Sequence, residues 1–445
     1  MKILFISLGC DKNLADSEEM LGLLTAGGHE ITDDETQADA IVINTCCFIK
    51  DAKEESVETI LEMAGYKKTG SCHALIVTGC MAQRYQKEII EEVPEVDAVL
   101  GTTSYGDIVK ALEEAVAGNH FEEFRDIDYL PDTGSKRVLT TGGHFGYLKI
   151  AEGCDKHCTY CIIPKLRGKF RSVPMERLIA QAEDMAEQGV KELILVAQET
   201  TVYGKDLYGK KSLHILLKKL CEIRGIRWIR ILYCYPEEIY DELIETIRDE
   251  KKICHYLDIP IQHASDRILK RMGRRTSKQE LIDIVGKLRK EIPDIVLRTT
   301  LITGFPGETE EDHEELKEFV DEMEFDRLGV FTYSPEENTP AAEMADQVPE
   351  EVKEERRDEL MELQQEISYD RGQDRIGQEL LVMIEGKVAD ESAYIGRTYG
   401  DAPKVDGYIF VQTGELLMTG DFAKVRVTGA LEYDLIGVLS DEYTE

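Results

Sequence analysis

The chain has 445 residues and carries 53 lysines and arginines against 88 aspartates and glutamates, a formal net charge of −35. This length exceeds what one hydrophobic core organises, so two to four domains are expected. An apolar share of 42% excludes a disordered chain, and no apolar run approaches the roughly 20 residues of a membrane span. The negative field repels phosphate backbones and attracts basic partners, so stable nucleic-acid binding is not expected.

The first residues form an apolar segment that ends in Ser7-Leu8-Gly9-Cys10, which resembles a lipoprotein cleavage site. The apolar stretch is six residues long, whereas a secretory core has roughly 7–15 residues. The segment also continues directly into a helical pattern. We therefore predict a buried first strand, no membrane association and a cytoplasmic location.

Apolar strands and amphipathic helices alternate in the first part of the chain. The strands are expected at 2–8, 40–45 and 74–78, and the helices at 16–27, 52–65 and 86–93. Continuously apolar strands between amphipathic helices indicate a parallel sheet covered on both faces. We predict an N-terminal α/β domain over residues 1–118, followed by a linker over 119–139 that contains the turn formers Pro131, Asp132 and Gly134.

The alternation resumes with longer spacing in the central part of the chain. Six strands are expected, at 147–151, 192–196, 228–232, 256–259, 296–302 and 327–331. Six strand–helix units predict an incomplete relative of the eight-fold barrel, with its chemistry at the carboxyl ends of the strands. This domain is predicted over residues 140–374 and includes a strongly charged helix at its end.

The last part of the chain, residues 375–445, changes to short alternating strands separated by glycine turns. Strands are expected at 380–384, 394–398, 407–411 and 422–427. This pattern predicts a small all-β barrel of the OB type. The fold class is therefore α/β, with two α/β domains followed by a small β-barrel.

Eleven cysteines, an odd number in a reducing compartment, indicate metal ligation or catalysis rather than disulfides. Cys154, Cys158 and Cys161 follow the first central strand with the spacing C-x3-C-x2-C. A cubic iron–sulfur cluster has four irons, so three local thiolates leave one iron free to bind a small molecule. The alternative is a structural zinc site that also uses His157, but joint chelation by His157 and its neighbour Cys158 is awkward.

Three further cysteines, Cys10, Cys46 and Cys80, each follow a predicted strand of the N-terminal domain. The carboxyl ends of parallel strands lie along one edge of a sheet, so these thiols are expected to converge on a second three-cysteine cluster. The alternative is three buried free cysteines. Cys47 is a competitor for Cys46, but strand alternation directs it to the opposite side, and Cys46 is therefore the predicted ligand.

These features together carry a family resemblance over nearly the whole chain. The segments that carry it are Ser7-Leu8-Gly9-Cys10-Asp11-Lys12-Asn13, Cys161-Ile162-Ile163-Pro164, Arg167-Gly168-Lys169 and Gly396-Arg397-Thr398-Tyr399. With the two cysteine trios and the terminal barrel, they resemble the methylthiotransferase family of radical-SAM enzymes. The first and last segments are similar to the members that modify an aspartate of small-subunit ribosomal protein number twelve. Asp11 and Glu199 depart from the usual family pattern.

The resemblance implies a fold, a set of cofactors and a mechanism. It implies a radical-SAM barrel, a terminal barrel of the TRAM type, two [4Fe-4S] clusters and S-adenosylmethionine (SAM). The cluster held by Cys154, Cys158 and Cys161 would cleave SAM to a radical that abstracts hydrogen from the aspartate β-carbon. The cluster held by Cys10, Cys46 and Cys80 would carry an extra sulfur from a sulfur donor, which one SAM methylates. A second SAM would yield the radical, and the resulting carbon radical would take the methylthio unit. A low-potential donor such as flavodoxin or ferredoxin would supply electrons.

The resemblance also suggests residues that contact SAM near the barrel cluster. They are Tyr160, Gln262, Arg298, Thr300, Gly304 and Glu308. For His263, a structural hydrogen-bonding role and a functional role are both open.

Two alternative functions remain open at this point. One is methylthio transfer to a tRNA adenosine, and the other is a non-catalytic iron–sulfur protein that binds ribosomes or carries electrons. Residues 379–445 contain thirteen acidic and five basic side chains. A domain that grips tRNA should be basic, whereas an acidic one suits a basic ribosomal protein. Acidic side chains that only keep the barrel soluble are the alternative explanation.

Overall fold

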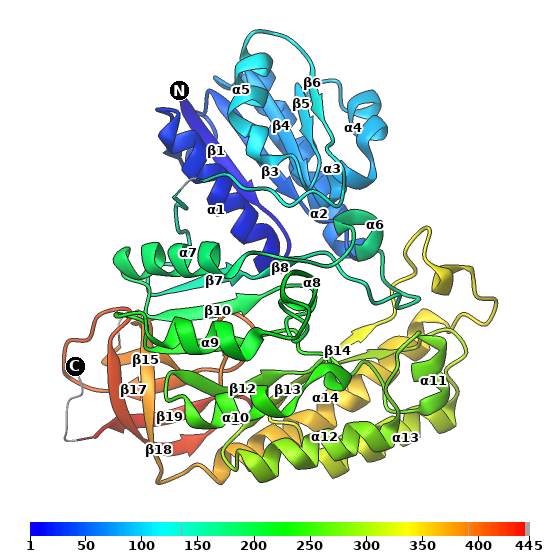
Figure 1. Cartoon of the computed structure of the whole chain (residues 1–445), viewed down its shortest axis with the longest axis vertical. Coiled ribbons are helices and arrows are strands. Elements are labelled where there is room, and N and C mark those ends of the chain that lie inside the picture. Colours follow the sequence, from blue (N-terminus) through cyan, green and yellow to red (C-terminus); the bar gives the residue numbers. More distant parts are fainter. Residues whose placement is uncertain (135, 390, 441–445) are drawn as a thin grey trace.

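Three separate β-structures organise the chain in the computed structural model, which describes residues 1–134, 136–389 and 391–440. Figure 1 shows the N-terminal sheet above the central half-barrel, with the C-terminal barrel beside the lower end of the half-barrel. Among the described helices, none is long and apolar enough to cross a membrane. The predicted fold class, with two parallel α/β parts and a small β-barrel, is confirmed.

The N-terminal sheet has six parallel strands in the order β2-β1-β3-β4-β5-β6. Their bounds are β1 Lys2–Ser7, β2 Glu30–Thr32, β3 Ala40–Thr45, β4 Ala74–Gly79, β5 Ala98–Leu100 and β6 Phe121–Glu123. The central strands β3 and β4 are buried along their whole length. Because helices cover both faces of a parallel sheet, these strands contain apolar residues at nearly every position.

The helices of this domain are α1 Asp11–Ala26, α2 Lys50–Thr69, α3 Cys80–Arg84, α4 Gln86–Glu92 and α5 Ile108–Val116, with a 3-10 turn η1 at Tyr105–Asp107. The sequence pattern predicts three of the six strands. The missed strands β2, β5 and β6 are three residues long, too short for a periodic signal. Strand β6 also lies inside the stretch expected to be a linker, 119–139, so the sheet continues past residue 118.

The central sheet is an open parallel half-barrel in the order β14-β13-β12-β11-β10-β7. Its strands are β7 Phe145–Lys149, β10 Glu192–Val196, β11 Trp228–Ile231, β12 Ile253–Asp258, β13 Val296–Thr303 and β14 Arg327–Thr332. All six predicted strands are present, with ends shifted by up to three residues. A short antiparallel pair, β8 Ala151–Glu152 and β9 Arg171–Ser172, follows the first strand.

The helices of this part of the chain lie mainly on the outer face of the half-barrel (Figure 1), and we call its inner side, where residues of the C-terminal barrel pack, the lumen. They are α6 Ile163–Arg167, α7 Met175–Glu187, α8 Lys205–Tyr208, α9 Leu213–Cys221, α10 Asp241–Asp249, α11 Asp266–Arg271, α12 Lys278–Glu291, α13 Glu310–Met323 and α14 Glu350–Gln373, with 3-10 turns η2 Pro236–Glu238 and η3 Pro340–Glu343. Alternation along β13 separates the two faces: Leu297 and Leu301 pack in the helix-covered core, whereas Val296 packs in the lumen core.

The C-terminal domain is a closed barrel in the order β15-β16-β17-β19-β18. Its strands are β15 Glu379–Lys387, β16 Ala393–Thr398, β17 Ile409–Gln412, β18 Phe422–Ala430 and β19 Leu435–Leu439. The sequence pattern predicts four of them and misses β19. Met383 and Phe422 of this barrel pack with Trp228 and Tyr256 of the half-barrel, so the small barrel closes one end of the lumen.

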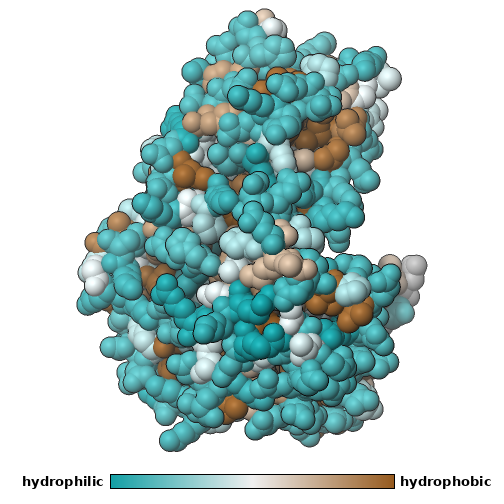
Figure 2. Space-filling model, turned by 90° about the vertical axis from the view of Figure 1, so that its right-hand side faces the viewer, coloured by the Kyte–Doolittle hydropathy of each residue, from teal (hydrophilic) through white to brown (hydrophobic). Residues whose placement is uncertain are grey.

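An apolar groove lies between α2 and α4 on the N-terminal domain, with a volume of about 660 Å³. Val57, Ile60, Met81 and Ile89 are among the residues that line it. Figure 2 shows apolar side chains gathered on this face of the N-terminal domain and an indentation below them, where the domain meets the half-barrel.

A fully buried charge cluster joins the half-barrel to the C-terminal barrel. The Glu192 carboxylate on β10 accepts from Arg230 Nε at 2.8 Å and from Arg397 Nη2 of β16 at 2.7 Å. Arg397 also binds Glu385 Oε1 at 2.6 Å. Burial alone would raise the pKa of Glu192, but Arg397 and Arg230 outweigh it and hold that pKa below its ordinary value. Glu192 is therefore ionised, and together with Glu385 it balances the charges of Arg230 and Arg397.

Replacing Glu192 by glutamine should destabilise the chain strongly, because it leaves two buried guanidinium groups without their shared carboxylate. The expected loss is about 3–5 kcal/mol. The matched control is Glu379→Gln, which removes an exposed ion pair with Arg426 and should cost less than about 1 kcal/mol. Urea unfolding followed by circular dichroism measures both. Equal shifts of the two midpoints would show that the buried cluster contributes no more than a surface pair.

Candidate functional site

The three N-terminal cysteines gather at the carboxyl edge of the sheet, as the sequence predicts. Cys10 precedes α1, Cys46 follows β3 and Cys80 is the first residue of α3 after β4. Burial raises the pKa of the Cys46 thiol to about 12, and the neighbouring Cys80 and Cys10 thiols raise it further. Since metal ligation requires thiolates, binding at this edge has to release protons.

Gly9 leaves the space that the Cys46 side chain occupies. Its backbone has φ +85°, and a Cβ atom at this position would stand 2.6 Å from Cys46 Cβ and 2.8 Å from Cys46 Sγ. Cys47, by contrast, is fully buried in the hydrophobic core with Ile60 and Met63. Cys80 belongs to the same cluster, and its charge adds to the burial that raises the pKa of Cys47. The choice of Cys46 over Cys47 as a ligand therefore stays a prediction.

Cys154, Cys158 and Cys161 lie together on the loop that follows β8. Burial raises the pKa of Cys154 to about 11, and the Cys154 Sγ accepts from the Lys156 backbone N–H at 3.4 Å. Burial also raises the pKa of Cys161, and the neighbouring thiols of Cys158 and Cys154 add to this shift. Lys156 Nζ anchors the loop to Glu238 at 2.6 Å and to Glu237 at 3.1 Å.

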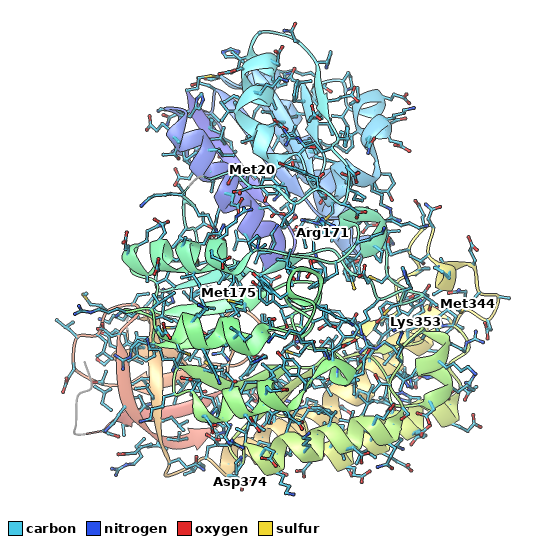
Figure 3. The ribbon with its side chains drawn as sticks, in the orientation of Figure 1. Met20, Arg171, Met175, Met344, Lys353 and Asp374 are labelled. Carbon is cyan, nitrogen blue, oxygen red and sulfur yellow. The ribbon has the colours of Figure 1, made fainter. Side chains whose placement is uncertain are left out.

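A buried network of charges bridges the two cysteine trios. Arg167 donates from Nη1 to Asp16 at 2.8 Å and to Glu152 at 3.2 Å, and its Nε lies 3.4 Å from Cys80 Sγ. Lys149 pairs with the same two carboxylates. Arg171, which lies where the N-terminal domain meets the half-barrel (Figure 3), holds the Arg167 backbone carbonyl at 3.1 Å. The N-terminal domain is therefore locked onto the half-barrel next to both trios.

The start of α1 also reaches residues that line the lumen. Tyr233 donates from its hydroxyl to Asp11 at 3.3 Å, and Lys12 Nζ stands 3.3 Å above the centre of the Tyr233 ring. Two residues further along the chain, the Tyr235 hydroxyl is 3.9 Å from Cys158 Sγ. A short stretch of the half-barrel thus touches both the segment after Cys10 and the loop of the second trio.

Four of the residues expected to contact SAM lie toward the lumen. Arg298 on β13 is held by Asp258 at 2.7 Å and by Asp406 of the C-terminal domain at 3.3 Å, and it reaches Thr300 Oγ1 at 3.3 Å. Gln262 bonds through its backbone to Thr300 and Ile302 of the same strand. Tyr160 packs edge-on against Phe305 with ring centres 6.5 Å apart.

The other two, Gly304 and Glu308, make structural contacts with α14. Arg356 of α14 donates to Glu308 Oε1 at 2.9 Å, and the fully buried His263 stands 3.6 Å from Glu308 Oε2. His263 Nδ1 accepts from the Ser265 backbone N–H at 3.0 Å, so its ring has a structural role. Gly304 leaves room for Lys353 of α14, the helix labelled at Lys353 in Figure 3. SAM contact by Gly304 and Glu308 stays a prediction.

Several residues of this region were not predicted from the sequence as site residues. Arg167, Asp16, Lys149 and Glu152 form the bridging network although they are far apart in sequence. Glu199, in the polar segment after β10, has a pKa raised to about 7, chiefly by burial. A usable signal existed for Lys149 and Glu152, which end β7 and β8, because sites form at the carboxyl ends of strands in parallel sheets. Asp16 and Arg167 lie in the helices α1 and α6 and carry no such signal.

The donor chemistry of this region fits iron–sulfur clusters. Each of the two trios offers three thiols, and thiolates are the usual ligands of such clusters. The Arg167 guanidinium beside Cys80 compensates negative charge on that trio. Within the described residues, no group of three or more His, Cys, Asp or Glu side chains stands at the spacing that holds a single metal ion.

Comparison with known proteins agrees with this architecture. Residues 2–101 match the model of uncharacterized protein family UPF0004, residues 148–320 match the radical SAM superfamily, and residues 376–439 match the TRAM domain. Among solved structures, the radical SAM methyltransferase TsrM from Kitasatospora setae has a TM-score of 0.55 at 14% identity, with 76% of each chain covered. OxsB, a cobalamin-dependent radical enzyme, has a TM-score of 0.52 at 15% identity over 77% of this chain and 54% of its own. These likenesses show the fold.

The half-barrel with its three-cysteine loop and the radical SAM match define the class: the chain is a radical-SAM enzyme. Relatives named ribosomal protein uS12 methylthiotransferase RimO cover nearly the whole chain. The protein from Lachnoclostridium phytofermentans is 66% identical over 98% of this chain and 99% of its own. The one from Pelotomaculum thermopropionicum is 52% identical over 98% and 99%. The chain therefore belongs to the RimO family of methylthiotransferases.

Replacing Gly9 by alanine should displace the Cys46 side chain and lower the iron content after anaerobic reconstitution toward half. The matched control is Gly28→Ala, because Gly28 has φ +83° but nothing within 4 Å of the added Cβ. Both variants carry the same backbone strain, about 1–2 kcal/mol, and only the first disturbs a thiol. Full iron content in Gly9→Ala would argue against Cys46 as a ligand.

Proposed function

We propose that the chain attaches a methylthio group to the β-carbon of an aspartate in ribosomal protein uS12, the small-subunit protein number twelve. The relatives that carry this activity in their names cover 98–100% of the chain at 49–66% identity. A match of this extent includes all three domains, so it supports the same reaction and the same class of substrate.

The observation that carries the proposal is the junction of the two cysteine trios. Arg167 touches Cys80 and follows Cys161 by six residues, and Asp11 beside Cys10 accepts from Tyr233. Methylthio transfer, as the family resemblance implies it, needs a sulfur-bearing centre and a radical-generating centre within reach of one carbon atom. These contacts tie the segments that carry the two trios to each other, which supports placing both centres within reach of one carbon atom.

Cys154, Cys158 and Cys161 would hold one [4Fe-4S] cluster, and Cys10, Cys46 and Cys80 the other. When bound, the first supplies the electron that cleaves SAM to methionine and a deoxyadenosyl radical, and the second supplies an iron with an open position for the transferred sulfur. Flavodoxin or ferredoxin is the electron donor that we propose.

The side chains of this protein would position SAM and exclude water. Arg298 is already fixed by two carboxylates, so its guanidinium and the Thr300 hydroxyl present a preorganised polar surface to the SAM carboxylate and ribose. Gln262 extends that surface, and Tyr160 would pack against the adenine. Met383 and Phe422 close the far end of the lumen, which keeps solvent away from a radical. Glu308 and Gly304 act through α14, which they hold against β13.

Methylthio transfer to tRNA is the second candidate, and the charge of the chain disfavours it. The C-terminal segment from residue 379 onward has thirteen acidic and five basic side chains. A segment with this net negative charge disfavours a polyphosphate backbone and suits a basic ribosomal protein. A non-catalytic iron–sulfur protein remains the alternative of another class, and SAM cleavage assays separate it from both enzymes.

Deleting the gene should remove a methylthio group from uS12 and leave tRNA unchanged, because the proposed substrate is the ribosomal protein. Mass spectrometry of uS12 and of hydrolysed tRNA from the same cells measures both. Plasmid-borne wild-type chain should restore the modification, and a Cys154→Ala variant should not. Loss of a methylthio group from tRNA instead of uS12 would contradict the proposal and support methylthio transfer to tRNA.

The reconstituted chain should contain about eight irons, from two four-iron cubes. Replacing Cys154, Cys158 and Cys161 by alanine should leave about half of the iron and abolish SAM cleavage. Replacing Cys10, Cys46 and Cys80 should remove the other half but retain SAM cleavage, since the radical centre is intact. Cys221→Ala is the control, because Cys221 lies in α9, away from both trios. Unchanged iron in the second triple variant would contradict the N-terminal cluster.

A further inference from the structure

A basic run interrupts the acidic sequence directly beside the loop of the barrel trio. The twelve residues from Arg267 to Lys278 contain six basic side chains and no acidic one, in a chain with a net charge of −35. The run covers α11 and the turn that leads into α12. A local positive charge in a strongly acidic protein gives this surface a preference for negatively charged partners.

Part of this positive charge is neutralised inside the protein. Arg267 pairs with Asp312, Arg271 with Asp346 and Lys278 with Glu315. The acids that face the same turn are also engaged, because Lys156 binds both Glu237 and Glu238. Lys270 and Arg275 are exposed, and within the described ranges neither has an ion pair. The turn therefore keeps two free cations at its surface.

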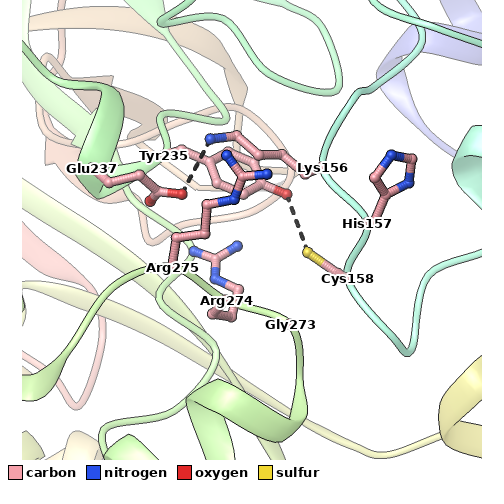
Figure 4. A pocket seen from close by; sticks show the side chains of 8 residues that line it. All are labelled: Lys156, His157, Cys158, Tyr235, Glu237, Gly273, Arg274 and Arg275. Atoms are coloured by element: carbon pink, nitrogen blue, oxygen red, sulfur yellow. Dashed lines mark hydrogen bonds and ion pairs between the residues drawn. The ribbon is translucent and has the colours of Figure 1, made fainter.

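The turn is joined to the cysteine loop by direct contacts. Thr159 donates from its backbone N–H to the Met272 carbonyl and from its hydroxyl to the Arg271 carbonyl, both at 2.9 Å. A Cβ atom on Gly273 would stand 2.9 Å from the His157 carbonyl oxygen, so the two backbones touch there. Figure 4 shows the Cys158 sulfur pointing into the small cavity that Arg274, Arg275 and Tyr235 line.

Arg274 adds a buried cation behind this surface. It is 7% exposed, stacks 4.4 Å above the Tyr235 ring and donates from Nη2 to the Pro260 carbonyl at 2.8 Å. Among the described residues, its Nε and Nη1 have no hydrogen-bond partner. A buried guanidinium with free donors is costly, so its placement beside Cys158 indicates a requirement for positive charge at that point.

We propose that the surface formed by Lys270, Gly273, Arg275 and His157 is the docking site of an acidic one-electron carrier protein that reduces the barrel centre. The proposal rests on the proposed function, since it presumes that Cys154, Cys158 and Cys161 hold that centre. One electron leaves the carrier, crosses the contact between Gly273 and His157, and breaks one sulfur–carbon bond of SAM. The products are methionine and a deoxyadenosyl radical, and the carrier is oxidised by one electron.

Charge and size select this partner over the basic substrate. A positive surface attracts an acidic carrier such as flavodoxin and repels a basic ribosomal protein. The patch is small, which suits a transient electron-transfer encounter, since such interfaces bury less than about 1,200 Å².

The test uses the reconstituted holoenzyme with a double charge reversal, Lys270→Glu with Arg275→Glu. The matched control is Lys218→Glu with Lys219→Glu, two exposed lysines of α9. Flavodoxin binding is measured directly by titration at low and high ionic strength. SAM cleavage is measured twice, with reduced flavodoxin and with sodium dithionite, a small reductant that needs no docking surface.

The reversal should weaken flavodoxin binding and slow flavodoxin-driven cleavage on the order of tenfold or more at low salt. The difference should shrink at high salt, where charges are screened. Dithionite-driven cleavage should stay at the wild-type rate, and the α9 control should behave as wild type in every assay. Unchanged flavodoxin binding and unchanged flavodoxin-driven rates would overturn the proposal.

Two further outcomes keep this proposal separate from the proposed function. Absence of SAM cleavage in the wild-type chain with dithionite would refute the radical-SAM reaction and not the docking surface. If the charge reversal also lowers dithionite-driven cleavage, the reversal has disturbed the barrel centre itself. The neutral variant Lys270→Gln with Arg275→Gln then tests docking separately. It must lose flavodoxin affinity while retaining the dithionite-driven rate, and failure to do so overturns the proposal.

Discussion

The buried contact between Asp16, Glu152, Lys149 and Arg167 is the constraint on which the rest of the structure depends. Two cations and two carboxylates meet there with side chains at most 8% exposed. Burial alone would raise the pKa of Glu152, but Lys149 and Arg167 outweigh it and lower that pKa strongly. A buried pair of this kind adds little net stability, yet removing one partner is very unfavourable. The cluster therefore fixes the position of the N-terminal domain relative to the half-barrel, because any other position would leave a buried charge unpaired.

That position brings the carboxyl edges of two parallel sheets together. Cys10 follows the first strand of one sheet, and Cys154 follows the first strands of the other. Either edge alone is an ordinary place for a ligand in an α/β protein. Joined through Arg167, they form one site with two sets of thiols. The sulfur chemistry proposed for the chain requires this joining rather than either domain by itself.

Local sequence signals predicted the long strands and both trios, because continuous apolar runs and cysteine spacing are short-range patterns. The same signals failed for β2, β5 and β6, whose three residues each carry no period and pair only because a neighbouring strand is already in place. They also missed the five-residue strand β19. Arg167 and Asp16 illustrate the second limit. They lie 151 positions apart, and a contact between buried charges leaves no periodicity in either segment. The ion pair of Glu308 with Arg356 was likewise not predicted, since Arg356 belongs to a distant helix.

Several acidic side chains of the C-terminal barrel form ion pairs inside the protein, which changes how the net charge of this domain is interpreted. Asp401 binds Arg327, Asp406 binds Arg298 and Glu385 binds Arg397. Asp401 and Asp406 hold the small barrel against the half-barrel, and Glu385 pairs with Arg397 within the small barrel. These three acids are therefore paired inside the protein and offer little negative charge to a partner. The remaining surface acids still oppose a polyanion, while the free cations at Lys270 and Arg275 lie beside the barrel trio. A basic substrate is attracted to the acidic surface and repelled by the positive one, and the reverse holds for an acidic electron carrier. The two partners can therefore bind one enzyme without competing.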